Sequence, residues 1–95
     1  MWNHRIVKTT AYLDPQTETL IPYPEPVYGI KEVYYDESKT PDSFSDPFTN
    51  TETLKNLAQT YKWMMDAFKH PVLFFDGTKL TVTDEIYKPK KGKKK

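Results

Sequence analysis

Hydrophobic and polar positions follow two different periods along the chain, and the first half follows that of a strand. From Trp2 to Thr9 successive side chains alternate in character, and β-branched residues gather toward the end of the run. An imperfect alternation returns over Val27–Asp36 and again in a short run at Ser43–Phe48. Pro47 places that third run at a sheet edge or at a strand end. The first half of the chain therefore predicts three strands.

The period changes to that of an α-helix after Thr53. Apolar side chains recur at i, i+3, i+4, i+7, i+10, i+11 and i+14 and form one stripe: Leu54, Leu57, Ala58, Tyr61, Met64, Met65 and Phe68. Asn50, Thr51 and Thr53 are alternative N-caps, and Pro71 ends the helix. An amphipathic helix is the clearest element that the pattern predicts.

Two further β-rich runs follow the helix, at Val72–Phe75 and Lys79–Thr83. They flank Asp76-Gly77, a pair that suits a two-residue type I′ hairpin turn. The resulting order β-β-β-α-β-β predicts a small α+β fold in which the helix packs on one face of an antiparallel sheet.

The segment between the first two strands, residues 13–29, is rich in proline. Pro15, Pro22, Pro24 and Pro26 lack the N–H that a sheet ladder requires and keep the preceding residues extended. We expect a loop with polyproline-like character there, opened by a type I turn at Asp14–Thr17.

Length and composition narrow the class of protein. Ninety-five residues suffice for one domain with a thin core, and 15% aromatic residues imply that large rings supply much of the buried area. The absence of cysteine excludes disulfides and thiolate chemistry, and no run approaches the ~18 apolar residues of a membrane span. The expectation is a cytoplasmic protein with no membrane contact, folded over residues 1–87.

Charge is distributed unevenly, since six of the 14 basic residues lie in the last eight positions. Without them, eight basic residues face 13 acidic ones, a balance of −5. We expect residues 88–95 to be a disordered tail, which can bind polyanions such as nucleic acid weakly and without sequence preference. A merely solubilising tail is an equally open alternative. The candidate polyanion-binding residues are Lys88, Lys90, Lys91, Lys93, Lys94 and Lys95.

Three sequence blocks resemble a group of short bacterial and phage proteins of unknown function. The blocks are Trp2-Asn3-His4-Arg5-Ile6, the run from Tyr28 to Glu37 (YGIKEVYYDE), and Pro71-Val72-Leu73. The resemblance implies a hairpin followed by a helix and makes a phage accessory role an expectation. It implies no activity. The chain departs from the pattern in its proline-rich first loop, in a turn without glycine near Ser38, and after Phe74.

Residues with catalytic or ligating chemistry are sparse. Only His4 and His70 offer imidazole ligands, and they lie on separate elements, so no metal site or cofactor is expected. Ser38, Ser43 and Ser45 lack a nucleophile motif, and the acids Asp36, Glu37 and Asp42 lie where solvated turns place them. The prediction is a non-enzymatic protein with no catalytic residues.

Aromatic residues offer two further binding hypotheses. Tyr28, Tyr34 and Tyr35 could stack on nucleic-acid bases beside Arg5 or Lys31, but the neighbouring acids favour a structural role under the helix and across from Trp2. Trp63 falls outside the main helical stripe, so it either widens the buried face or is an exposed anchor for a protein partner or a second copy. An interaction or self-associating module is the preferred prediction.

Overall fold

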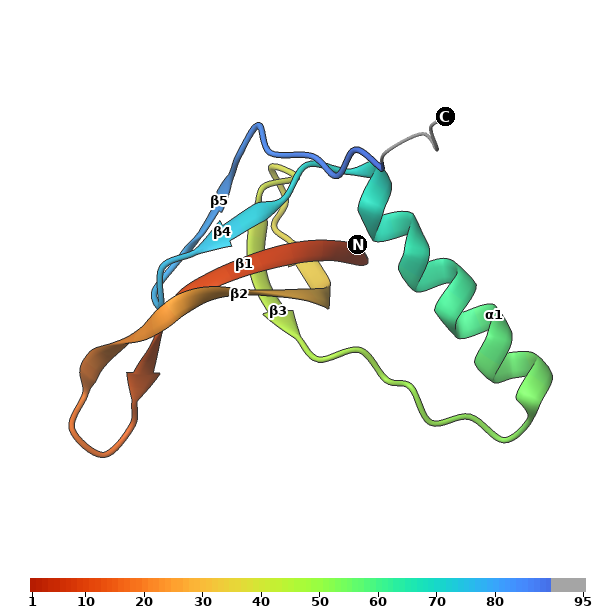
Figure 1. The fold of residues 1–95 in the computed structure, drawn as a ribbon, viewed down its shortest axis with the longest axis horizontal. Coiled ribbons are helices and arrows are strands. Elements are labelled where there is room, and N and C mark those ends of the chain that lie inside the picture. Colours follow the sequence, from red (N-terminus) through yellow and green to blue (C-terminus); the bar gives the residue numbers. More distant parts are fainter. Residues whose placement is uncertain (90–95) are drawn as a thin grey trace.

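The computed structural model describes residues 1–89 and shows a small α+β protein, as predicted (Figure 1). Its elements are β1 (Trp2–Asp14), β2 (Thr19–Tyr35), β3 (Pro41–Ser45), α1 (Leu54–Met64), a 3-10 helix (Met65–Lys69), β4 (Leu73–Phe75) and β5 (Leu80–Val82). Thr53 is the N-cap of α1, because its hydroxyl accepts the amide of Asn56 at 3.0 Å.

The sheet is mixed, and the prediction of an antiparallel sheet was wrong. Its strand order is β3-β2-β1-β4-β5, with β4 parallel to β1 and the other pairs antiparallel. After β3 the chain passes through α1 and returns beside β1 in the same direction, where Leu73 pairs with Val7. Side-chain alternation indicates which face of the sheet a residue occupies, but not the direction in which the neighbouring strand runs. The pattern therefore could not distinguish a mixed sheet from an antiparallel one.

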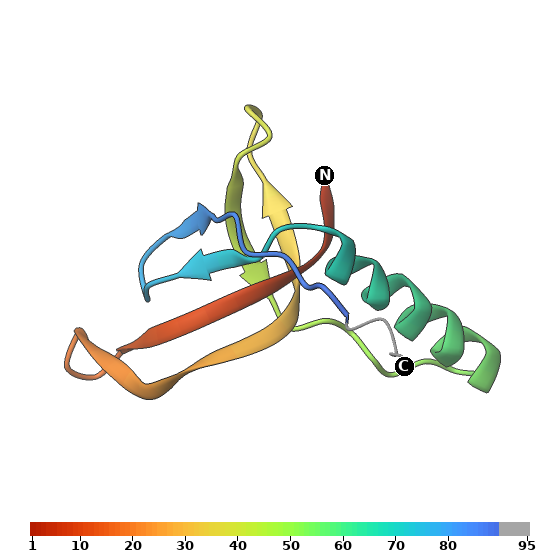
Figure 2. The ribbon, with the colours of Figure 1, turned by 45° about the horizontal axis from the view of Figure 1, so that its top comes forward.

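The proline-rich segment is part of a long hairpin, and most of the loop predicted for residues 13–29 was wrong. Leu13 pairs with Leu20, and Ala11 pairs with Pro22. The register then shifts, since Thr9 pairs with Val27 and residues 23–26 have no partner. Prolines tolerate an extended backbone but cannot donate to a ladder, so they produce a bulged strand rather than a loop. Figures 1 and 2 show this hairpin projecting on the side of the molecule opposite to α1.

The main core lies on the face of the sheet away from α1. Val7, Val33 and Leu73 are fully buried there, and half-buried residues including Phe44 and Phe75 pack around them. The edge strands β3 and β5 contact each other, so the sheet curls around this cluster. The rings of Phe44 in β3 and Phe75 in β4 meet edge to face with centroids 4.9 Å apart, a favourable geometry for an aromatic pair. This contact stabilises the curled sheet.

The helical segment packs on one face of the sheet, but only through the end of α1 and the 3-10 helix that follows. Ala67 is buried against Ile6 and Val72, and Met64 is the buried residue of α1. At the other end Leu54 is 83% exposed, and Tyr61 is 50% exposed. The pattern correctly predicted an amphipathic helix, but helical periodicity carries no information about how far the helix overlaps the sheet.

The turn between β4 and β5 is not the predicted two-residue type I′ turn. Phe75 pairs with Leu80, which leaves a four-residue loop at 76–79. The Asp76 carboxylate accepts hydrogen bonds from the amides of Thr78 and Lys79 and from the Thr78 hydroxyl. Only Gly77, at φ 101°, has a left-handed backbone in this loop, whereas a type I′ turn requires two such residues.

Candidate functional site

An open groove of about 610 Å³ runs between the start of β1 and the helical segment. One wall is formed by Trp2, Asn3 and His4 of β1. The other wall is formed by the last turns of α1 and the 3-10 helix. We call this feature the tryptophan groove, because both tryptophans of the chain line it.

Both tryptophan side chains are largely open to solvent within the groove. Trp63 is 60% exposed and Trp2 is 51% exposed. Trp63 therefore does not widen the buried face, and of the two roles open for it only the exposed position agrees with the structure. Met65, at 60% exposed, adds a flexible apolar side chain to the same lining.

Trp2 was missed as a candidate, because its place in a predicted strand suggested that it packs against the tyrosines. It does pair in register with Tyr34. Its ring, however, meets His4 edge to face, with centroids 5.3 Å apart, and faces the groove. No sequence signal links Trp2 to Trp63, since only the tertiary fold brings the two elements together.

The rim of the groove carries a net positive charge. Asp66 contacts Lys69 at 3.5 Å and His70 at 3.4 Å, so its carboxylate already has basic partners from the same helical segment. Lys62 forms no ion pair with any residue of the part of the chain that the structure describes. An exposed ammonium beside two indole rings is suited to an acidic side chain of a partner.

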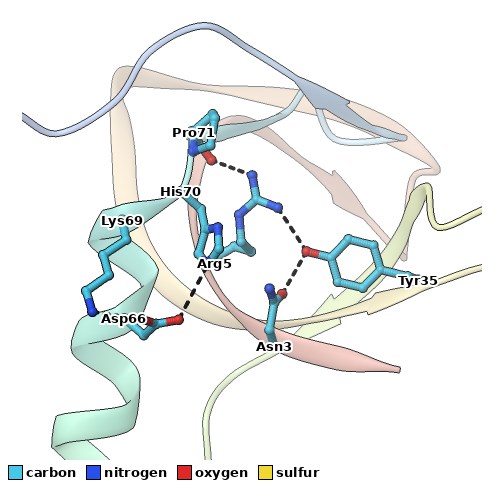
Figure 3. Close-up of polar contacts among 7 residues, drawn as sticks. All are labelled: Asn3, Arg5, Tyr35, Asp66, Lys69, His70 and Pro71. Carbon is cyan, nitrogen blue, oxygen red and sulfur yellow. Dashed lines mark hydrogen bonds and ion pairs between the residues drawn. The ribbon is translucent and has the colours of Figure 1, made fainter.

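A buried arginine fixes the two walls of the groove relative to each other (Figure 3). Arg5, which is 8% exposed, donates from Nη2 to the carbonyl oxygen of Pro71 at 2.6 Å. Its Nη1 donates to the hydroxyl of Tyr35 at 2.9 Å, and that hydroxyl donates to Oδ1 of Asn3 at 2.7 Å. The network ties β1 to β2 and to the residues that follow the helical segment.

The burial of Arg5 argues against the contact with nucleic acid that was considered for it beside the tyrosines. Within residues 1–89 no carboxylate lies within ion-pair distance of the guanidinium, and its Nε has no hydrogen-bond partner. Neutral oxygens therefore solvate this buried charge. Such a group is costly to bury, so its position reflects a structural constraint rather than a surface contact.

Residues from all three sequence blocks singled out above meet in this same network. Asn3 and Arg5 come from the first block, Tyr35 from the second and Pro71 from the third.

Two of the three tyrosines of the second block, Tyr28 and Tyr34, are bound to acids. Tyr28 donates to Glu85 at 2.9 Å, and Tyr34 donates to Glu32 at 3.0 Å. The two rings are 49% and 37% exposed, so the expectation that they lie under the helix was wrong. Their carboxylate neighbours repel a phosphate backbone, which argues against base stacking on this strand.

Among residues 1–89 no three His, Asp or Glu side chains are close enough to hold a metal ion. A second cavity of about 350 Å³, between the hairpin and the main core, has Lys31 as its charged lining residue. The Lys31 ammonium binds Asp46, and this hydrogen bond together with the positive charge lowers the pKa of Asp46.

The lysine tail lies mostly beyond the part of the chain that the structure describes. Lys88 is exposed after β5. The other candidates, Lys90, Lys91, Lys93, Lys94 and Lys95, are outside the described residues, as is most of the predicted disordered segment. No helix within residues 1–89 is long and apolar enough to cross a membrane.

No protein-family model matches the chain, and no curated protein or solved structure is significantly similar to it. The tryptophan groove is therefore the feature from which a function has to be inferred.

Proposed function

We propose that this protein is a non-enzymatic interaction module that docks a protein partner through the tryptophan groove. The observation that supports the proposal is the exposure of Trp2 and Trp63 in one groove, at 51% and 60%. A buried indole contributes one of the largest apolar areas of any side chain, so leaving two of them in water forfeits considerable stabilisation.

Tryptophan is also the residue most enriched among interface hot spots, typically near the centre of a contact and surrounded by a polar rim. Here Trp2 and Trp63 lie between polar residues that include Lys62 and Asp66. The groove is open rather than enclosed, which suits a segment of a protein better than a sequestered small molecule.

Site-specific photocrosslinking in the cell tests this proposal. A photoreactive residue replaces Lys62 at the groove, and in a matched control it replaces Lys55, which lies outside the groove on the same helix. We expect a protein adduct at position 62 that Trp2→Ala strongly reduces, together with little or no adduct at position 55. Equal adducts at both positions, or none at position 62, would contradict a groove-specific contact.

We propose a second function, binding of nucleic acid or another polyanion through the lysine tail, on the strength of the charge distribution alone. Six basic residues at one end of a chain whose remainder has a balance of −5 favour a nonspecific, salt-dependent contact. Fluorescence anisotropy of labelled single-stranded and duplex DNA compares the full chain with a chain ending at Tyr87. Binding that disappears with the tail and with added salt supports this function, and binding that survives truncation assigns it to the folded surface.

A further inference from the structure

We propose that the tryptophan groove binds the proline-rich segment Pro22–Pro26 of a second copy of this chain, so that two copies form a reciprocal dimer. The inference rests on the proposed function, because it names the occupant of the same groove. It follows from the structure of the segment, from its chemistry and from the shape of the molecule.

The proline-rich segment is presented outward, and four of its five residues are free of pairing with β1. All five residues of Pro-Tyr-Pro-Glu-Pro are exposed. Residues 23–26 are also skipped in the register with β1. Because the three prolines hold φ near −65° within an extended run, the backbone there is preset to a polyproline-like conformation.

Preset proline-rich segments are recognised by grooves lined with aromatic side chains, because the rigid segment loses little entropy on binding. The tryptophan groove presents two exposed indoles, Trp2 and Trp63. Tyr23 adds an aromatic ring to the segment, where it packs against Tyr12 with centroids 5.2 Å apart.

The charges of the two surfaces are complementary. From Thr9 to Ile30 the chain contains Asp14, Glu18 and Glu25 and no lysine or arginine. The groove carries Lys62 and Lys69 against the single acid Asp66. Glu25, at the centre of the segment, is thus matched to the exposed ammonium of Lys62.

A chain cannot place this segment in its own groove. The bulge lies opposite Thr10 and the groove begins at Trp2 to His4, which places them about 20 Å apart along β1 at the rise of a β-strand. Figures 1 and 2 also show the hairpin and α1 at opposite ends of the molecule. Two copies related by a two-fold axis, with their β1 strands antiparallel, would form both segment-to-groove contacts at once and close the assembly.

The extended shape of the molecule is consistent with a surface that a second copy would cover. The Cα radius of gyration is 15.5 Å, whereas a compact chain of this length has about 12 Å. The hairpin and α1, which project from opposite ends of the molecule, are the two elements that the dimer would bring together (Figures 1 and 2).

Sedimentation equilibrium of the full chain and its variants is the first test. We expect a dimer whose dissociation constant rises at least about 30-fold in Trp63→Ala, the loss typical of a central interface aromatic. Tyr61→Ala is the matched control, since this exposed aromatic lies on α1 outside the groove and should leave the dimer intact. A dimer lost in Tyr61→Ala and kept in Trp63→Ala would place the interface on the other face of the helix and overturn the proposal.

Charge reversal tests the pairing directly. Lys62→Glu and Glu25→Lys should each weaken self-association several-fold, because an exposed ion pair is lost at both contacts of the dimer. Mixing the two variants should restore association, since each segment then meets a groove of opposite charge. Failure of the mixture to recover would contradict the assigned pairing.

A peptide separates this inference from the proposed function. The segment 19–28 (TLIPYPEPVY) contains no tryptophan, so its binding can be followed through the emission of Trp2 and Trp63. We expect a saturable blue shift and competition with the dimer, and neither effect with a peptide in which the three prolines are alanine. A monomeric chain that does not bind the peptide would overturn the dimer, while a Trp2-dependent crosslink from position 62 to a different protein would leave the proposed function standing.

Discussion

Arg5 donates to the carbonyl oxygen of Pro71 at 2.6 Å and so joins residues 66 positions apart in the chain. The contact connects β1 to the residue that ends the helical segment, and it therefore sets the distance between the two walls of the tryptophan groove. The Tyr35 hydroxyl accepts a hydrogen bond from the same guanidinium and donates one to Oδ1 of Asn3. One buried side chain that is not part of the groove lining thus helps to set the geometry of the candidate site, together with the apolar contact of Ala67 with Ile6 and Val72.

Removing the Tyr35 hydroxyl should destabilise the fold. Tyr35→Phe deprives Arg5 of an acceptor and Asn3 of a donor in a partly buried network, so we expect a loss of about 1–3 kcal/mol in the free energy of unfolding. Chemical denaturation measures it. Tyr34→Phe is the control, since its hydroxyl bonds are exposed and its loss should be smaller. Equal losses in the two variants would show that the Arg5 network contributes no more to stability than an exposed hydrogen bond.

Two leucine substitutions test where the core lies. Leu73→Ala opens a cavity in a fully buried position and should cost about 2–5 kcal/mol, a large part of the stability of a small domain. Leu54→Ala removes a side chain that is 83% exposed and should change stability by no more than about 0.5 kcal/mol. Thermal or urea unfolding compares them. A large loss in Leu54→Ala would mean that the N-terminal half of α1 is covered after all.

The two glycines in or beside the strands should respond differently to alanine. Gly77 has φ of 101°, and a Cβ there would come within 2.6 Å of Cδ2 of Leu20 and 3.3 Å of the Ala11 carbonyl oxygen. Gly77→Ala should therefore destabilise by more than about 1 kcal/mol. A Cβ at Gly29 meets only the flexible end of Lys31, at 3.4 Å, so Gly29→Ala should be tolerated. Denaturant midpoints of the two variants decide the comparison.

Asp76 should titrate well below an ordinary aspartate. Hydrogen bonds from the Thr78 hydroxyl and from the amides of Lys79 and Thr78 hold its pKa at about 2. Since the pKa is depressed in the folded state, this carboxylate stabilises the loop above the unfolded value of about 3.9, and the contribution is lost as the pH falls toward 2. Carboxyl-carbon NMR gives the midpoint directly. A midpoint near 4 would mean that the hydrogen bonds of the loop are not formed in solution.

Local elements were predictable from the residues themselves. The apolar spacing from Leu54 onward, with Thr53 among the N-cap candidates, predicts an amphipathic helix. The alternation from Trp2 predicts a strand. Proline was harder to interpret. A residue without an N–H is compatible with both a loop and a bulged strand, and pairing with β1 decides between them.

The α+β class, the helix and the absence of cysteine chemistry could be predicted from the residues alone, because they depend on composition and on contacts between residues a few positions apart. Three features could not be predicted in this way: the parallel pairing of β4 with β1, the exposure of the first half of α1, and the groove between Trp2 and Trp63. Each depends on the relative placement of distant segments, and that placement is set by long-range contacts such as Arg5 to Pro71, which no local periodicity encodes.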